Sequence, residues 1–166
     1  MVDIKFKKSI KQKKMEKVII FAHKTEPNAV IPKVAYNNTS AAFDLTCTQT
    51  TTIPPNQSGV IPNGLNLTIG EGDGYYMKID LRSSMGFKKE MVPHSGIVDE
   101  GYTGNLGVKV YNLGTEPITI NEGERYAQIT VLPRPNYSIQ ELNDEEFEEM
   151  KSLQSRGDGG FGSSGK

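Results

Sequence analysis

Asp99 is the residue of this sequence best placed to do chemistry. It directly follows the short apolar run 96–98, and three glycines lie within the next eight residues. A carboxylate held at the end of a rigid strand, and partly desolvated by Ile97 and Val98, could serve as a general base. An aspartate before glycine-rich sequence also commonly caps a turn. The pattern predicts a tight hairpin beside a pocket, in which Tyr102 could be a stacking platform or a cross-strand pair.

A second candidate site lies in the segment 82–86, which reads Arg-Ser-Ser-Met-Gly. Its guanidinium and hydroxyl groups suit phosphate oxygens, and its glycine would let backbone N–H groups approach an anion. The same composition is typical of an ordinary turn at the end of a strand. The segment alone therefore leaves an anion site and a simple turn open.

The third candidate is the glycine- and serine-rich segment 156–166. Its glycines superficially resemble a phosphate-binding loop, but the required strand–loop–helix context is missing. Arg156 and Phe161 would have no purpose in a plain linker. An arginine for an anion and an aromatic for a ring indicate a lid that becomes ordered on a ligand.

The elements that must position these candidates are expected to be short strands. Apolar and polar residues alternate in the segments 65–69, 77–81, 106–110 and 127–131. This is the period of a half-buried strand, and the breaks are rich in Pro, Gly and Asn, as turns require. The pattern predicts an all-β sandwich, jelly roll or barrel. The one expected helix spans 138–150, with Ser138 as its cap before Glu141.

The composition narrows the class of protein. The chain has 166 residues with 36% hydrophobic content, 17 Gly, 9 Pro and one Cys. This length predicts one domain, and the glycine and proline content favours turn-rich β structure. One cysteine can form neither an intrachain disulfide nor a cysteine zinc site, so we expect a cytoplasmic protein and a Cys47 that is a small core residue. The early apolar run 18–22 is too short to span a membrane, and a net charge of −1 argues against a nucleic-acid binder.

Charge is concentrated near the two ends. Residues 1–17 carry +5, almost all from lysine, and residues 141–149 carry −6. These segments could be a nucleic-acid-binding arm and a partner-binding tail, or a frayed terminus and a solvated helix face. We therefore expect three parts. They are a basic leader at 1–17, a β domain at 18–155 with an acidic helix or linker at 138–155, and a lid at 156–166.

Taken in chain order, these segments resemble the five motifs of the homotrimeric deoxyuridine triphosphate nucleotidohydrolases (dUTPases). The resemblance covers roughly residues 30–166, through the segments 41–45, 82–86, 96–108, 123–128 and 156–165. Any one of these could arise by chance, but five in order are highly specific. The resemblance implies a distorted jelly-roll β-barrel in a homotrimer. Three subunits would build each active site, and a flexible C-terminal arm would close over it.

The resemblance also implies a role for each matching residue. Asp99 would activate the water that attacks the α-phosphorus of dUTP, releasing dUMP and pyrophosphate. Tyr102 would lie under the deoxyribose, and Asp44 would hold Mg²⁺ through water. Arg125 would make a buried structural ion pair. The remaining implied substrate-binding residues are Gly96, Asn105 and Gly107 around the uracil, Arg82, Ser83, Ser84 and Gly86 from a second subunit, Gln128 near the α-phosphate, and Arg156, Phe161, Ser163 and Ser164 in the lid.

The charge of the implied substrate supports a metal ion in the site. A triphosphate carries about four negative charges, and one arginine cannot neutralise it. The implied reaction would keep uracil out of DNA and supply dUMP for dTMP synthesis. Two alternatives remain open. The dCTP deaminases share the fold and the phosphate-binding residues, but they need an acid–base group at the base, for which the matching strand offers no glutamate. If the protein is viral or phage-encoded, it would act in the host cytoplasm and could also bind a regulatory protein partner.

Overall fold

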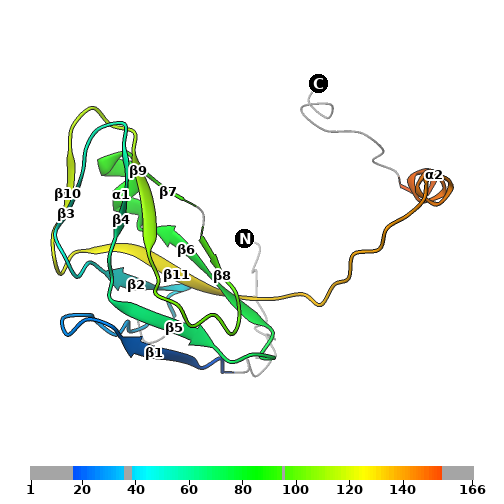
Figure 1. Ribbon diagram of the computed structural model, residues 1–166, viewed down its shortest axis with the longest axis horizontal. Helices are drawn as coiled ribbons and strands as arrows, with labels where there is room; N and C mark the ends of the chain where they lie inside the picture. The colour runs from blue at the N-terminus through cyan, green and yellow to red at the C-terminus, as the bar shows by residue number, and fades with distance from the viewer. Residues whose placement is uncertain (1–16, 36–38, 95, 155–166) are drawn as a thin grey trace, which may run out of the picture. The chain divides into compact units, whose positions relative to one another are not determined.

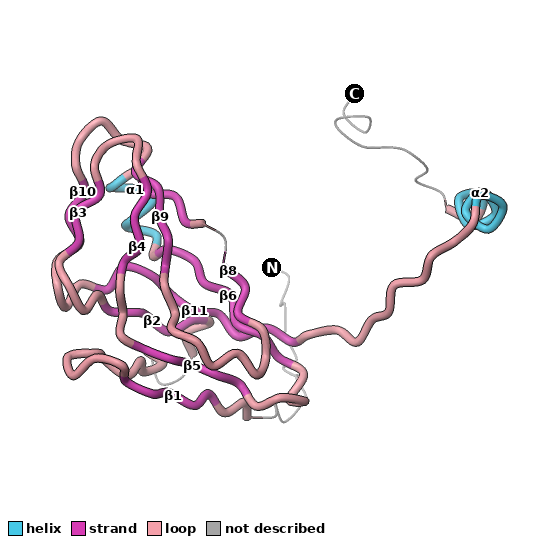
Figure 2. The backbone as a smooth tube through the Cα atoms, in the orientation of Figure 1, coloured by secondary structure: helices cyan, strands magenta, loops and turns pink. Residues whose placement is uncertain are grey.

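The computed structural model describes residues 17–35, 39–94 and 96–154, which form parts of two compact units, 1–135 and 136–166. Figure 1 shows the first unit as layers of strands, and Figure 2 shows how little helix it contains. The predicted leader and lid fall outside the described residues, apart from Lys17. The predicted division at 17/18 and 155/156 therefore stays a prediction. No helix among the described residues is long and apolar enough to cross a membrane.

The first unit is built from short strands and one short helix. In chain order the strands are β1 (Ile20–Lys24), β2 (Ala42–Thr46), β3 (Thr51–Ile53), β4 (Ser58–Ile61), β5 (Leu65–Ile69), β6 (Tyr75–Leu81), β7 (Met91–Pro93), β8 (Gly96–Val98), β9 (Val108–Asn112), β10 (Ile118–Ile120) and β11 (Arg125–Pro133). The helix α1 (Ser83–Lys89) lies between β6 and β7.

The strands pair in antiparallel fashion in several small sheets. The largest has the order β2-β11-β6-β8, and a second has the order β4-β9-β7. Two-stranded sheets join β1 to β5 and β3 to β10. Across the described residues no sheet closes on itself, so the all-β prediction is confirmed without a closed barrel. The register on the central strand β11 places Gln128 opposite Asp44 of β2 and Asp80 of β6.

The core sits between the sheets and follows the predicted alternation. Leu65, Leu67 and Ile69 of β5 are at most 1% exposed, while the residues between them are half-buried. The same alternation holds in β6 and β9. Cys47 is 1% exposed, so its predicted place in the core is confirmed, and burial raises the pKa of its thiol. Burying one face of these strands in this way supplies most of the favourable free energy of folding.

The structure departs from the sequence patterns at two segments of the first unit. The segment 82–86, for which an anion site and a simple turn were both open, forms the start of α1, in which Arg82 is the N-cap and Met85 is the buried residue. The segment 96–107 does not form the predicted tight hairpin. Its flanking strands belong to different sheets, since β8 pairs with β6 whereas β9 pairs with β4 and β7. The apolar alternation predicted for β9 is confirmed, but alternation does not identify a strand's partner.

The second unit holds the helix α2 (Asp144–Ser152). Its cap is Asn143, whose side chain accepts the N–H of Glu146 at 3.0 Å, while the Glu146 carboxylate accepts the N–H of Asn143 at 2.9 Å. This reciprocal capping box satisfies two amides of the first turn. The predicted start at Ser138 is therefore wrong by one and a half turns. No residue of α2 is buried, so a solvated helix face and a partner-binding tail both stay open.

Candidate active site

Asp99 lies at the edge of a pocket of about 340 Å³ in the first unit. The strand β8 supplies one wall, and the chain that runs on from it to β9 supplies the other. The pocket is lined by Ile79, Gly96, Ile97, Val98, Asp99, Tyr102, Asn105, Leu106 and Gly107. Asp99 carries the one carboxylate among these residues, and its side chain is exposed to solvent. An exposed carboxylate beside a largely apolar wall can take a proton from a water bound in the pocket.

A tight turn fixes the backbone of Asp99. The N–H of Tyr102 donates to the carbonyl of Asp99 at 3.3 Å, and Gly101 has a φ of +76°. A positive φ at the third position of a turn is what a type II turn requires, and glycine adopts it at no steric cost. The N–H of Gly101 also donates to the carbonyl of Ile69 at 3.0 Å, which ties the turn to the end of β5.

The far wall of the pocket is held against β5. The N–H of Leu106 donates to the carbonyl of Leu65 at 3.1 Å. The carbonyl of Leu106 accepts a hydrogen bond from the buried side chain of Asn63. The hydroxyl of Tyr102 donates to the carbonyl of Asn105 at 3.3 Å, so the ring folds back over Gly104, where any side chain would collide with it. Tyr102 therefore packs on its own loop and does not form a cross-strand pair, and it keeps 45% of its surface exposed.

A second set of polar residues lies around Asp44 on β2. Its Oδ1 contacts Nε of Arg82 at 3.1 Å, and its Oδ2 contacts Nη1 of Arg125 at 3.0 Å. These three residues line a cavity of about 740 Å³ together with Ser83 and Gln128. Two guanidinium groups on one carboxylate leave a net positive charge. The cavity therefore suits an anion such as a phosphate chain.

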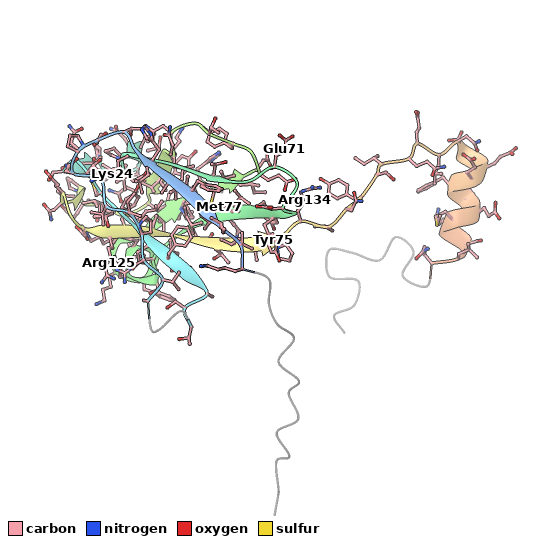
Figure 3. The ribbon with its side chains drawn as sticks, turned by 90° about the horizontal axis from the view of Figure 1, so that it is seen from below. Lys24, Glu71, Tyr75, Met77, Arg125 and Arg134 are labelled. Atoms are coloured by element: carbon pink, nitrogen blue, oxygen red, sulfur yellow. The ribbon has the colours of Figure 1, made fainter. Side chains whose placement is uncertain are left out.

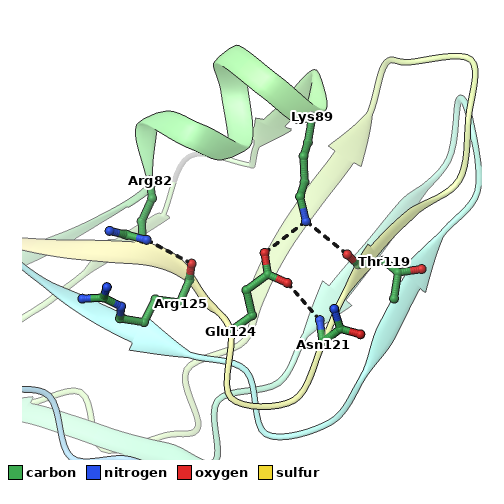
Figure 4. Close-up of polar contacts among 6 residues, drawn as sticks. All are labelled: Arg82, Lys89, Thr119, Asn121, Glu124 and Arg125. Carbon is green, nitrogen blue, oxygen red and sulfur yellow. Dashed lines mark hydrogen bonds and ion pairs between the residues drawn. The ribbon is translucent and has the colours of Figure 1, made fainter.

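The helix α1, which carries Ser83 and Gly86, is anchored at its other end (Figure 4). Nζ of Lys89 donates to Oε1 of Glu124 at 3.0 Å and to the carbonyl of Thr119 at 3.2 Å. Burial acts to raise the pKa of Glu124, but hydrogen bonds from the Asn121 N–H and from Lys89 outweigh it, and the pKa lies below its ordinary value. Glu124 therefore stays ionised and holds the helix near the start of β11.

The structure brings the predicted site residues together as two groups. Gly96, Asp99, Tyr102, Asn105 and Gly107 line the Asp99 pocket. Asp44, Arg82, Ser83 and Gln128 line the Asp44 cavity, and Gly86 lines an adjoining cavity of about 400 Å³ with Arg82 and Ser83. Ser84 is half-buried in the first turn of α1. Arg156, Phe161, Ser163 and Ser164 lie outside the described residues.

The two groups do not meet within one chain. The Asp99 pocket and the Asp44 cavity share no lining residue. The predicted ion pair of Arg125 is present, but the prediction that it is buried is wrong, because the Arg125 side chain is 59% exposed. Arg125 lines the Asp44 cavity, where its side chain meets solvent, which accounts for the difference.

Sequence reasoning did not identify Asn63, Glu100 or Arg134 as contributors to the site. Asn63 is 1% exposed and supports the pocket wall, but in the sequence it gives only a turn signal between Pro62 and Gly64. Glu100 forms an ion pair with Arg134, 34 positions further along the chain. No local sequence pattern predicts a contact between two residues that lie so far apart in the chain.

The comparisons with known proteins agree with this geometry. The sequence profile of the dUTPase family matches residues 28–165. The deoxyuridine 5′-triphosphate nucleotidohydrolase of Wolinella succinogenes is 40% identical over 157 residues, which cover 92% of this chain and 97% of that protein. The solved dUTPase of Staphylococcus bacteriophage 80alpha with dUPNHPP has a TM-score of 0.78 at 26% identity, covering 89% of this chain and 99% of its own.

A third match is one of fold alone. A mutant dUTPase from phage phi11 of S. aureus, described with a structural Mg(II) ion, has a TM-score of 0.70 at 22% identity and covers 76% of this chain and 97% of its own. The profile match and the relative from Wolinella succinogenes identify the chain as a nucleotide hydrolase. The chain belongs to the dUTPase family, the dUTP diphosphatases.

Proposed function

We propose that this dUTPase hydrolyses dUTP to dUMP and pyrophosphate with Asp99 as the general base. A water between Asp99 and the α-phosphorus gives one proton to the carboxylate as its oxygen bonds to phosphorus. The bond from the α-phosphorus to the oxygen that bridges to the β-phosphorus breaks, and pyrophosphate leaves with that oxygen. Phosphoryl transfer of this kind rests on positioning and charge stabilisation, so one oriented base suffices. The observation that carries the proposal is the lone, exposed carboxylate of Asp99 at the edge of a nucleoside-sized pocket.

The walls of the same pocket account for selection of the nucleoside. Tyr102 lines the pocket and would lie under the deoxyribose, where a 2′-hydroxyl would not fit. Gly96, Asn105 and Gly107 surround the place for the uracil, where backbone donors and acceptors can read its edge. A base with mismatched donors and acceptors leaves buried polar groups unpaired, which discriminates more strongly than a methyl-sized pocket can.

The phosphates would be bound by a second copy of the chain. Arg82, Ser83, Gly86 and Gln128 line cavities that are separate from the Asp99 pocket of their own chain, with Ser84 beside them on α1. A site that needs both sets is incomplete without a partner, and a closed ring of identical subunits supplies one for every site. We therefore propose a homotrimer with shared sites. Arg156, Phe161, Ser163 and Ser164 would cover the bound nucleotide, with Phe161 on the base.

Magnesium fits this site as an ion that binds together with the substrate phosphates. The part of the chain that the structure describes holds no group of three or more metal-ligating side chains, so Mg²⁺ would be held largely by phosphate oxygens and water. Asp44 gives each arginine one bond, and its carboxylate keeps further lone pairs to accept from a metal-bound water. Bound there, Mg²⁺ would neutralise charge on the phosphate oxygens.

The proposal is tested by measuring pyrophosphate release from dUTP, dTTP, dCTP and UTP with and without Mg²⁺. We expect rapid release from dUTP alone, and Mg²⁺ should increase it. Asp99→Asn should fold and bind nucleotide but lose roughly 10²–10⁴-fold in kcat. Near-wild-type turnover by Asp99→Asn would refute the role of this residue. Ammonia released from dCTP would instead identify a deaminase.

A regulatory role is a second candidate, because the similar dUTPase of phage 80alpha comes from a study of phage dUTPases that control transfer of virulence genes. It predicts that Asp99→Asn still captures a protein partner in a pulldown although turnover is lost. Loss of capture together with turnover would tie binding to the active enzyme.

A further inference from the structure

Glu100, the residue after Asp99, faces away from the Asp99 pocket and joins two other parts of the first unit. Its Oε1 contacts Nη2 of Arg134 at 2.6 Å, and its Oε2 accepts the N–H of Gly74 at 2.9 Å. Arg134 follows the last residue of β11, and Gly74 ends the loop between β5 and β6. The Glu100 side chain is only 14% exposed, so this carboxylate is bound on both oxygens and largely shielded from water.

Two backbone hydrogen bonds accompany the side-chain contacts of Glu100. The N–H of Arg134 donates to the carbonyl of Gly74 at 2.7 Å, and the N–H of Gly101 donates to the carbonyl of Ile69 at 3.0 Å. Figure 3 shows Arg134 at the same end of the first unit as Glu71, which belongs to this loop, and Tyr75, which follows it. The turn that carries Asp99 is therefore attached to β5, to the β5–β6 loop and to the end of β11. We name the contact of Glu100 with Gly74 and Arg134 the Glu100 latch.

We propose that the Glu100 latch is a positioning device for the catalytic reaction, holding the turn that aims Asp99 at the water. The inference rests on the proposed function, in which Asp99 is the general base. No described hydrogen bond or ion pair to the Asp99 carboxylate fixes its direction, so that direction depends on its backbone. A displacement of about 1 Å in a reacting group can cost up to 10²-fold in rate.

The groups around Glu100 favour its ionised form, which forms the ion pair with Arg134 and accepts the N–H of Gly74. The N–H of Gly74 lowers the pKa of Glu100 despite its burial, and Arg134 lowers it further. Glu100 is therefore ionised at neutral pH. Arg134 is also the penultimate residue of the first unit.

The test is steady-state hydrolysis of dUTP by the full-length chain and four variants. We expect Glu100→Gln and Arg134→Gln each to lower kcat about tenfold, while KM and the Kd of a non-hydrolysable dUTP analogue change less than about twofold. The double variant should lose no more than either single one, because both remove the same contact. Arg134→Lys keeps the charge and should recover part of kcat. A merely structural role would lower the melting temperature without this split between kcat and KM.

The matched control is Glu71→Gln, which removes the same charge from an exposed position on the same loop, outside the latch. It should keep wild-type kcat. Wild-type kcat in both single latch variants, or multiplied losses in the double variant, would overturn the proposal. If Glu100→Gln does not fold, an unchanged kcat in Arg134→Lys and Arg134→Gln overturns it equally. A wild-type chain that releases no pyrophosphate from dUTP would instead refute the proposed function.

Discussion

Replacing Asn63 with leucine should weaken both the fold and the nucleoside pocket. Asn63 is 1% exposed, its side-chain amide donates to the carbonyl of Leu106, and its Oδ1 accepts the N–H of Leu65 at 3.1 Å. Leu106 lines the Asp99 pocket, so this asparagine joins the turn before β5 to the pocket wall. Leucine has a similar size but can neither donate nor accept. Two buried backbone groups would therefore lose their partners.

The size of the effect follows from those two groups. A buried backbone group left unpaired costs about 1–3 kcal/mol, and the larger apolar surface of leucine offsets roughly 1 kcal/mol. We expect a net loss of about 3 kcal/mol in the free energy of unfolding. For a domain of this size that corresponds to a fall of roughly 6–12 °C in melting temperature. Because Leu106 is then released from the turn, KM for dUTP should rise about threefold to tenfold.

The assay compares thermal unfolding at one fixed protein concentration, since melting of an oligomer depends on concentration. The matched control is Asn112→Leu. Asn112 is also fully buried, and it bonds the backbone of Ile53, Glu116 and Gly114, but it does not line the Asp99 pocket. Asn112→Leu should lose at least as much stability, because it leaves three backbone groups unpaired, but KM should be unchanged. A fall of less than about 2 °C for Asn63→Leu, or an equal rise of KM in the control, would refute the reasoning.

Three other perturbations test separate features. Glu90 ends α1 with a φ of +53°, a conformation that suits glycine, so Glu90→Gly should stabilise the fold by about 0.5–1 kcal/mol, and a lower melting temperature would contradict this. The pKa of Glu124 is below its ordinary value of 4.5, so its ionised form stabilises the fold above that pH, and the stabilisation is lost as pH falls through the lowered pKa. Glu124→Gln should therefore melt below wild type at pH 7 but converge with it in acid, whereas a pH-independent difference would exclude ionic anchoring. Deleting 156–166 should leave the melting temperature almost unchanged while dUTP hydrolysis collapses, and a large stability loss would assign that segment to the core.

The strands of this protein were predictable because burial of one face leaves a period of two in the sequence. Leu65, Leu67 and Ile69 show that period and form β5. The helix α1 was not predictable from apolar spacing, because only Met85 of its residues is buried. The start of α2 was misplaced because Ser138 and Asn143 are both followed by a glutamate after three positions, and the sequence does not show which pair forms the capping box.

The residues of the site were predictable from the sequence, but the contacts that hold them were not. Asp99 and Arg82 could be singled out because their types and neighbours are typical of base and phosphate chemistry. The contacts that hold them depend on residues brought together from distant strands. Glu100 meets Arg134 only because β8 and β11 both lie against β6, and Arg125 meets Asp44 only through the pairing of β11 with β2. Contacts of this kind follow from sheet order, which local sequence patterns do not specify.

The separation of the Asp99 pocket from the Asp44 cavity has a genetic consequence. If different chains supply the two halves, an allele damaged at Asp99 and an allele damaged at Arg82 would complement each other in one cell, because mixed assemblies contain some intact combinations. Conversely, a chain damaged in both halves would inactivate every active site that it shares with a neighbouring subunit. Whether a mutation is dominant would then depend on which half of the site it damages. Natural selection would act on the interface between subunits as well as on each chain.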